Sequence, residues 1–593
     1  MRHPNKNIAL TGIVACILAS CVKAPTSSEP LLSKQADFCN LINIKNTPAG
    51  AVDWDAYVFA DKGAWMAYSL PDNENRRHAG TFMGPMVMTG RGWIAAGLAE
   101  PTLWVNGEQY RMVYNVQTTR YLPGKLIQEY NDENLNFTTE LCYLTSRSVA
   151  IRSIVKNMSQ KPVKVSFDWN GGVYEPTSVV SSIDKGLSFI RPKDSTNTVI
   201  RFLTADKIQA VGSDSLHVTE KSEMTLEPGK TYQSEMTQTL TLRGEDTAKE
   251  LAAIATLNID NCFELNEQQW NAQIASLLSG NSKYLKDNKY RKVLVKAMMT
   301  LNSNYRTPAG DILHGGSNPS YNGFINGIWS WDSWKIASGN VHFNEEIAKS
   351  EMITLFDYQA DNGMVPDFIS YNKKYNNWRD AKPPVAAWGA MNVYKATGDK
   401  KFLETMFDKL YKFHQWYAER DHNHNGICEY GSTDGTLIAA CWESGMDNGV
   451  RFDDAVMQKN SEKAWSMNQE NICLNSFLYV DKTILAEMAT LLNKPELAAQ
   501  LNAEAKVIKE FVQTKMWDKE TGFFYDTRID TGEHIKVMGA ECWLPLWAGI
   551  ATPEQAKQVM QKMMDPQKFN STLPLGTLDI SHPRLRPVRG YWR

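Results

Sequence analysis

The 593-residue chain lacks an excess of either charge, any closely spaced cysteine pair and any long apolar segment beyond its first residues. Lysine and arginine together number 63 against 66 aspartate and glutamate, which gives a formal net charge of −3. Proteins that bind nucleic acid concentrate basic residues, so this balance argues against a nucleic-acid partner. No Cys-x-x-Cys pair points to zinc, and most of the seven cysteines after Cys21 are expected to be buried thiols.

Several common catalytic signatures are also missing. The sequence has no His-Glu-x-x-His zinc motif, no P-loop, no Gly-x-Ser-x-Gly motif and no convincing dinucleotide-binding glycine pattern. Tryptophan is abundant instead, with 18 residues. Flat apolar rings suit stacking on the C–H faces of sugars, although packing in a core explains buried tryptophans equally well.

The first residues have the pattern of an export signal. Arg2 and Lys6 precede an apolar run from Ile8 to Ala19 that is too short for a permanent membrane span. The end of this run, Leu18-Ala-Ser-Cys21, resembles a lipoprotein box and predicts lipidation at Cys21, with an ordinary signal peptide as the alternative. We therefore expect a signal peptide at 1–21, a flexible linker at 22–40, and an exported periplasmic or cell-surface lipoprotein that contacts the membrane only through its anchor.

Two kinds of periodicity divide the rest of the chain. Val163, Val165, Phe167 and Trp169 alternate with polar residues, which is typical of a strand with one buried face. Such patterns, with frequent turn signals, predict a β-sandwich domain over 41–245. Helical spacing begins near 248–257, so we interpret 246–285 as a helical linker and 286–593 as a helical domain. Helices are predicted within 400–420, 462–492 and 496–516, but the pattern alone does not decide between a solenoid and a closed toroid.

A tryptophan-rich segment is the first candidate for a site. Residues 327–335 read Gly-Ile-Trp-Ser-Trp-Asp-Ser-Trp-Lys. An aromatic ring can cover the apolar face of a sugar while a carboxylate accepts hydrogen bonds from its hydroxyls. The alternative is a helix entrance that packs in a core.

A second segment places two carboxylates four residues apart. It reads Trp442-Glu-Ser-Gly-Met-Asp447. Glycoside hydrolysis needs one protonated acid beside the leaving oxygen and a second carboxylate that activates water or attacks the sugar. Acidic residues are also common on surfaces, so this segment alone leaves both interpretations open.

A third segment resembles half of a calcium-binding loop. Asp421, Asn423, Asn425 and Gly426 match the first half of an EF-hand loop, in which oxygen ligands alternate and glycine permits the sharp turn. Position twelve would be Ser432, which cannot supply the bidentate carboxylate, so another acid must close such a site. A loop held by Asx turns is the alternative.

Taken together, these motifs resemble glycoside hydrolase family 63, especially its bacterial exported α-glucosidases related to mannosyl-oligosaccharide glucosidase. The resemblance runs from about residue 50 to the end of the sequence. It is carried by Phe59-Ala-Asp-Lys-Gly-Ala-Trp65, Leu70-Pro-Asp72, Trp331-Asp-Ser-Trp-Lys335, Val341-His-Phe-Asn344, Val365-Pro-Asp367, Trp442-Glu-Ser-Gly-Met-Asp447, Leu485-Ala-Glu-Met-Ala489 and Pro574-Leu-Gly-Thr577.

The resemblance implies a multidomain protein, in which an N-terminal β super-sandwich is followed by an (α/α)6 toroid. It implies hydrolysis with inversion, which releases glucose from α-glucosidic oligosaccharides and uses Asp447 as general acid. The protein is expected to be a monomer. The substrate-binding residues that it implies are Trp331, Asp332, Trp334, Lys335, Asp367, Trp388, Trp442 and Glu443. It also implies a structural calcium ion held by Asp421, Asn423, Asn425 and, from a Gln-Glu pair, Glu470.

The sequence departs from the family pattern at its end. In the family a Tyr-Trp-Arg-Gly segment precedes the general base by some tens of residues, and this sequence ends at Tyr591-Trp-Arg593. We therefore expect the acid without its base and a toroid without its last helices. A fragment of an ordinary enzyme is the favoured explanation, because Asp332, Glu443 and Asp447 are all present. The alternatives are an inactive glycan-binding lipoprotein and a trehalase-like or mannosylglycerate-type hydrolase on the same barrel.

Overall fold

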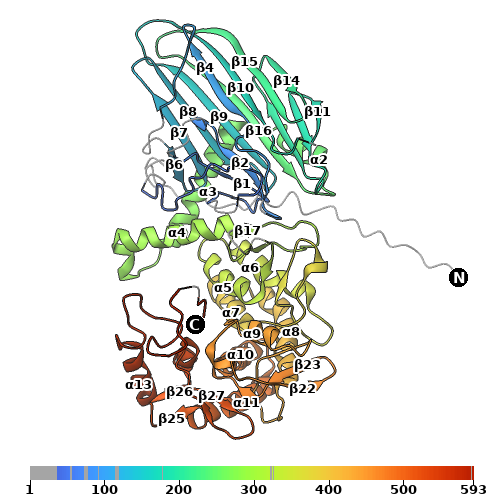
Figure 1. Ribbon diagram of the computed structural model, residues 1–593, viewed down its shortest axis with the longest axis vertical. Helices are drawn as coiled ribbons and strands as arrows, with labels where there is room; N and C mark the ends of the chain where they lie inside the picture. The colour runs from blue at the N-terminus through green and yellow to red at the C-terminus, as the bar shows by residue number, and fades with distance from the viewer. Residues whose placement is uncertain are drawn as a thin grey trace, which may run out of the picture.

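The structure, a computed structural model, describes residues 37–53, 57–72, 78–90, 92–113, 119–176, 178–320, 324, 326–588 and 590–592. The predicted signal peptide and the lipidation site Cys21 lie outside the described residues. Within the described ranges, no helix combines the length and the apolar character that crossing a membrane requires. The chain is multidomain, with a sheet-rich N-terminal domain followed by a helical region (Figure 1).

Three antiparallel sheets form the N-terminal domain. The largest has the strand order β11-β12-β13-β16-β9-β8-β7-β6, the second β14-β15-β10-β4-β5 and the third β1-β2-β3. The strands are β1 Met66–Ser69, β2 Met83–Val87, β3 Gly92–Trp93, β4 Glu100–Val105, β5 Glu108–Gln109, β6 Thr119–Leu122, β7 Lys125–Asn131, β8 Leu135–Tyr143, β9 Ser148–Asn157, β10 Val163–Gly172, β11 Val179–Ile183, β12 Gly186–Ile190, β13 Asn197–Phe202, β14 Lys207–Val211, β15 Ser215–Leu226 and β16 Thr231–Thr241.

The two large sheets pack against each other through the buried faces that alternation predicts. In β10, Val163, Val165, Phe167 and Trp169 are buried while the residues between them are more accessible. The ring of Phe167 meets that of Phe137 in β8, with ring centroids 6.1 Å apart. A strand period of two therefore places one apolar row of each sheet in a shared core.

The change from strands to helices falls between the end of β16 at Thr241 and the start of α2 at Thr247. Three helices follow: α2 Thr247–Ile254, α3 Ile259–Leu277 and α4 Asn288–Asn304. Helix α3 is anchored to the sheet domain, because the Trp270 indole donates to Asp61 at 2.9 Å and the Asn266 amide donates to the Gly124 carbonyl at 2.9 Å. Part of the region predicted as a linker, helix α3, therefore packs against the sheet domain.

The helical region contains short helices and small sheets. Its helices are α5 Ser330–Asn340, α6 Glu345–Thr354, α7 Ala386–Thr397, α8 Lys400–Trp416, α9 Leu437–Glu443, α10 Ile472–Leu491, α11 Pro495–Thr514, α12 Leu544–Trp547 and α13 Pro553–Met563. Its strands are β17 Tyr305–Arg306, β18 Gly316–Ser317, β19 Ile328–Trp329, β20 Phe368–Ile369, β21 Gly431–Ser432, β22 Met457–Ser461, β23 Ala464–Met467, β24 Gln469–Glu470, β25 Trp517–Asp518, β26 Phe523–Phe524, β27 Asp526–Arg528 and β28 His534–Ile535. Closure into a toroid remains a prediction.

Two of the predicted helices agree with the structure, and one is wrong at its start. The predictions at 400–420 and 496–516 correspond to α8 and α11. The predicted helix at 462–492 begins only at Ile472, because β23 and β24 occupy its first residues and pair with β21, β22 and β27. Hydrogen bonding between distant segments has overridden the local helical spacing there.

The cysteine prediction agrees with the structure. All seven cysteines among the described residues are free thiols, and five of them are buried.

Candidate active site

A pair of short strands brings two motifs of the candidate site together. β19 pairs with β20, so that Trp329 lies opposite Phe368. The chain enters α5 directly after β19, which places Trp331 and Asp332 in the first turn of that helix. Asp367 precedes β20, and its carbonyl accepts a hydrogen bond from the Ser330 amide at 2.9 Å. Ser330 and Asp367, which are 37 positions apart in the sequence, thus become neighbours.

A buried lysine joins the carboxylates of the site. The Lys382 ammonium lies 3.1 Å from Asp367 Oδ1 and 3.6 Å from Asp380 Oδ2, and it also donates to the Trp442 carbonyl. The Asn377 amide donates to Asp367 at 2.9 Å and to Asp380 at 2.8 Å. Burial lowers the pKa of Lys382, but Asp367 and Asp380 outweigh burial and raise that pKa above its usual value. Lys382 is therefore a fixed positive charge.

Burial favours the protonated form of three of the surrounding carboxyls. It raises the pKa of Asp367, with Lys382 opposing, and raises the pKa of Asp380, to which the neighbouring Asp367 adds. It also raises the pKa of Asp332, against the charges of Lys335 and Lys382. The free-energy cost of desolvating these carboxylates exceeds the stabilisation that they gain from sharing one lysine. Perturbed carboxyls gathered in this way are typical of functional sites.

The predicted acid Asp447 lies beside this cluster. Its side chain is half-buried, and burial raises its pKa while the charge of Lys382 opposes that shift. The turn that carries it depends on Gly445, which has a φ of +70°. A Cβ atom at this glycine would lie 2.3 Å from Cζ2 of Trp331. The Trp331 ring thus rests on the backbone that presents Asp447.

Glu443 adjoins the site from the interior, through the backbone of Ala381 next to Lys382. Its side chain is 0% exposed. It accepts from Arg420 Nε at 2.9 Å, from Arg420 Nη2 at 2.9 Å, and from the amides of Gly431 at 3.0 Å and Ala381 at 3.3 Å. A carboxylate that already accepts from this many donors in a closed interior has no surface for a sugar. Glu443 supports the segment that carries Trp442.

Of the remaining side chains predicted to bind substrate, some lie in the core and others lie at the surface. Trp334 is fully buried and packs against Phe356 and Phe413, so it is a core residue and not a wall of the site. The exposed Lys335 places its ammonium 3.3 Å from the centre of the Trp331 ring. Trp388 in α7 is half-buried and meets Trp547 of α12 at 6.3 Å between ring centroids.

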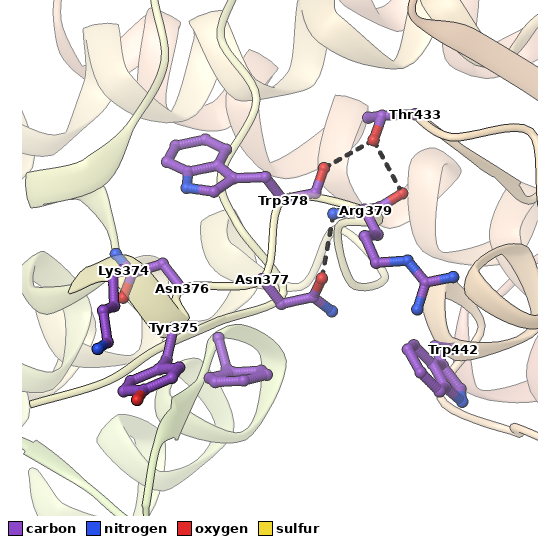
Figure 2. Close-up of a pocket in the computed structure, with 9 residues that line it drawn as sticks. Lys374, Tyr375, Asn376, Asn377, Trp378, Arg379, Thr433 and Trp442 are labelled. Carbon is purple, nitrogen blue, oxygen red and sulfur yellow. Dashed lines mark hydrogen bonds between the residues drawn. The ribbon is translucent and has the colours of Figure 1, made fainter. Parts of the chain in front are cut away.

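A groove of about 500 Å³ opens beside the carboxylates. It is lined by Phe368, Lys374, Tyr375, Asn376, Asn377, Trp378, Arg379, Thr433 and Trp442. Figure 2 shows Tyr375 and Trp442 on opposite sides, with the Arg379 guanidinium directed toward the Trp442 ring, 4.9 Å from its centre. Trp442 and Asn377 belong both to this groove and to the contacts around Lys382. The arrangement can hold a sugar chain next to an acid and its neighbouring carboxyls.

Two family models match separate parts of the chain. One describes a mannosylglycerate hydrolase MGH1-like glycoside hydrolase domain and matches residues 326–593. The other describes the N-terminal part of glucosidase YgjK and matches residues 51–182. The chain belongs to glycoside hydrolase family 63. It is therefore a glycoside hydrolase with a carbohydrate substrate.

Individual relatives of this family 63 protein are distant. A mannosylglycerate hydrolase of Rubrobacter radiotolerans is 26% identical, over 45% of this chain and 75% of the relative. A probable trehalase of Eremothecium gossypii is 23% identical, over 41% of this chain and 40% of the relative. A solved GH63 mannosylglycerate hydrolase of Thermus thermophilus is 21% identical, with a TM-score of 0.42, over 51% of this chain and 83% of that chain.

The predicted calcium residues of the family 63 chain do converge. Glu470 Oε1 accepts from the Asn425 amide at 2.8 Å and lies 3.5 Å from Asn423 Nδ2. Both oxygens of Asp421 accept from backbone amides of the same loop, at 3.1 Å from Asn425 and 2.8 Å from Gly426. Within the described part of the chain, no three His, Cys, Asp or Glu side chains are arranged to hold a metal by themselves. Amide and carbonyl oxygens would have to complete any site here.

Glu429 belongs to this loop and is absent from the predicted set. It is buried, one of its oxygens has no hydrogen-bond partner, and burial, Asp421 and Glu470 together raise its pKa far above the usual value. It occupies position nine of the loop, a position that EF-hand loops also use. That spacing is the signal by which it could have been found. The predicted set also lacks Lys382, Asp380 and Arg420. These residues lie outside every motif on which the sequence prediction rests.

The described residues near the end of the chain lie beside the acid. The Asn448 amide donates to the Gly590 carbonyl at 3.0 Å, and the Trp592 amide donates to Asn448 Oδ1 at 3.0 Å. Tyr591 is exposed between these contacts, and burial and the nearby Asp447 charge raise its pKa. Residues 590–592 thus form part of the surroundings of Asp447.

Proposed function

We propose that this family 63 hydrolase cleaves α-glucosidic bonds of oligosaccharides with inversion, and that Asp447 is its general acid. The observation that carries the proposal is the position of Asp447, half-buried near Lys382 and its carboxyl cluster, with a raised pKa. A general acid must keep its proton at the working pH, and partial burial has that effect on a carboxyl.

The other residues have supporting roles in this proposal. Asp332 accepts hydrogen bonds from sugar hydroxyls, and Trp331 covers an apolar face of the same ring. Lys382 holds Asp367 and Asp380 in place through its contacts at 3.1 and 3.6 Å. A positively charged centre that fixes several carboxyls keeps the sugar-binding geometry defined before substrate arrives.

The reaction follows from the chemistry of a single displacement. Asp447 gives its proton to the glycosidic oxygen as the bond from that oxygen to the anomeric carbon breaks. Water attacks the anomeric carbon from the opposite face and passes a proton to a second carboxylate, so that the configuration is inverted. The proposal gives the role of acid to Asp447 and names no second carboxylate.

Substitution of Asp447 tests the proposal. Asp447→Asn keeps the shape but cannot supply the proton, so we expect kcat on α-linked glucose oligosaccharides to fall by about 10²- to 10⁴-fold. Asp454→Asn, which changes an exposed carboxylate seven residues further on, is the matched control and is expected to keep its activity. In the unsubstituted protein, kcat/KM is expected to fall as the pH rises through the raised pKa of Asp447. Equal activity of the two variants would refute the assignment.

The names of the relatives define the competing substrates. Mannosylglycerate and trehalose are the substrates that those names suggest. Side-by-side assays of α-linked glucose oligosaccharides, mannosylglycerate, glucosylglycerate and trehalose decide among them. A kcat/KM for mannosylglycerate or trehalose far above that for every glucose oligosaccharide would replace the α-glucosidase proposal. NMR of the first product formed reports whether the anomer is inverted.

We further propose that the 421–429 loop binds a structural calcium ion. The loop fits the ion because the side chains of Asn423 and Asn425 meet Glu470 and one buried oxygen of Glu429 lacks a partner. Calcium prefers oxygen ligands of this kind. Asp421, Asn423, Asn425, Glu429 and Glu470 would hold it, and its effect would be on stability.

Export as a lipoprotein through Cys21 is also a proposal. It is supported by the lipoprotein-box sequence Leu18-Ala-Ser-Cys21. Labelling of cells with a palmitate analogue should mark the protein and should fail to mark Cys21→Ser. A label retained in that variant would contradict the proposal.

A further inference from the structure

We propose that the groove beside Trp442 is the leaving-group subsite, and that it binds a neutral sugar chain of two or more rings rather than a small anionic group. The inference rests on the proposed function, because it extends the same site in the direction of the leaving group. It adds the class of substrate that the site selects.

The groove is continuous with the carboxyl cluster. The ring of Trp442 lines the groove while its carbonyl accepts from Lys382, the central lysine of the cluster. Asn377 lines the groove while its amide donates to Asp367 and Asp380. A chain that fills the groove therefore reaches the residues that contact Lys382, and the nearby Asp447 charge helps to raise the pKa of that lysine.

The lining has the composition of a sugar site. Tyr375 is 61% exposed and stands across the groove from Trp442, as Figure 2 shows, and Phe368 also lines the groove. Exposed rings on two sides provide apolar faces for stacking. Asn376, Asn377 and Thr433 supply uncharged polar groups between them. Apolar walls with a few polar groups are typical of sites that orient an uncharged, hydroxyl-rich ligand.

The cations of the groove are already engaged. Arg379 donates to Asp434 at 2.6 Å and to Thr436 at 3.0 Å, and it covers the Trp442 ring. The Lys374 ammonium lies 4.7 Å from the centre of the Tyr375 ring. Because Asp434 compensates the charge of Arg379, a carboxylate in the groove would gain little from that residue. The space of about 500 Å³ also exceeds what a three-carbon acid needs and falls within the roughly 300–1,000 Å³ of small-molecule sites.

The loop that forms the groove is held from both domains. Trp65 of the sheet domain meets Tyr371 with 5.6 Å between ring centroids. The Lys373 amide donates to Asp311 at 3.0 Å, and the Thr433 hydroxyl donates to the Trp378 carbonyl at 2.8 Å (Figure 2). The groove is therefore preformed, which reduces the entropy lost when a flexible sugar chain binds.

A chain-length comparison tests this inference. α-Glucosyl fluoride carries no sugar as leaving group, whereas a glucose trisaccharide places two rings in the groove. The substitution is Tyr375→Ala, and its matched control is Tyr284→Ala, since Tyr284 is 53% exposed and has Lys283 at 5.1 Å from its ring in the same way. We expect Tyr375→Ala to lower the ratio of kcat/KM for trisaccharide to kcat/KM for fluoride by about 3- to 10-fold, as loss of one stacking contact implies. Tyr284→Ala should leave that ratio unchanged.

The outcomes separate the two proposals. An unchanged ratio in Tyr375→Ala overturns the groove assignment and leaves the proposed function intact. If the unsubstituted protein hydrolyses neither substrate, the α-glucosidase proposal fails, and calorimetry with maltotriose and with sodium glycerate then decides about the groove. Maltotriose binding that weakens by a similar factor in Tyr375→Ala supports a neutral sugar subsite. Glycerate binding without maltotriose binding overturns it in favour of an anionic leaving group.

Discussion

Glu443→Gln separates a structural role from a sugar-binding role, because the two predict different losses. Glu443 accepts hydrogen bonds from four nitrogens in a closed interior, two of Arg420 and the amides of Gly431 and Ala381. All of these partners are donors. The glutamine amide keeps the shape of the side chain, but its NH₂ group would face donors and find no acceptor.

The magnitude follows from the charge that is left behind. Arg420 is 0% exposed, and without Glu443 its guanidinium would be a buried charge lacking its carboxylate partner. Breaking a buried ion pair by removing one partner costs about 3–5 kcal/mol. Domain stabilities are roughly 5–15 kcal/mol, so a loss of this size takes a large part of the stability of the helical region.

Denaturant unfolding followed by tryptophan fluorescence measures this loss. The control is Asp447→Asn, which changes a half-buried carboxyl with a raised pKa and is expected to alter the free energy of unfolding by less than about 1 kcal/mol while abolishing activity. Glu443→Gln should show the reverse pattern, with a lower midpoint in the transition of the helical region. An unchanged midpoint together with weakened sugar binding would falsify the structural role and restore Glu443 as a substrate contact.

Three further predictions concern other parts of the site. Gly445→Ala should lower the free energy of unfolding by about 1–3 kcal/mol and weaken sugar binding, because φ is +70° and the new Cβ would meet Trp331 at 2.3 Å; calorimetry with maltose reads the binding. Burial raises the pKa of Glu351 from 4.5 to about 7, so the stability that its protonated form provides is complete below pH 4.5 and is lost as the pH rises from there to about 7. Glu351→Gln should remove that loss, on the order of 3 kcal/mol above pH 8, and flatten the pH dependence of thermal unfolding. EDTA should lower the melting temperature and 1 mM calcium restore it, with a gain of about 2.7 kcal/mol at a hundred times Kd, and Glu429→Gln should abolish the response.

The periodic parts of the fold were predictable because burial repeats along them. The alternation in β10 and the helical spacing in α8 each report one buried face, and the structure places those faces in the core. The start of the predicted helix at 462–492 was not predictable, since β23 is held by pairing with β21 and β22 and not by local preference.

The candidate site was predictable where a motif carried it. The β19–β20 pair brings the segment of Trp331 and Asp332 next to Asp367, and the Trp331 ring lies against Gly445, two residues before Asp447. Trp334 and Glu443 sit in the same motifs, but a motif does not say which side chains turn inward. Lys382 could not be assigned in advance, because its role arises from carboxyls up to 65 positions away that only the tertiary fold gathers around it.

If the groove selects the leaving group as proposed, the contact of Trp65 with Tyr371 gives the sheet domain a part in substrate choice. The Trp65 indole also donates to the Thr307 carbonyl at 2.9 Å, so one tryptophan of the sheets touches both the entry to the helical region and the loop ahead of the groove. Exchange of sheet domains between relatives would then change selectivity for the leaving group without touching any residue near Asp447. The sequences of the two domains are therefore expected to change together in evolution, because residues of both domains would affect specificity for the leaving group.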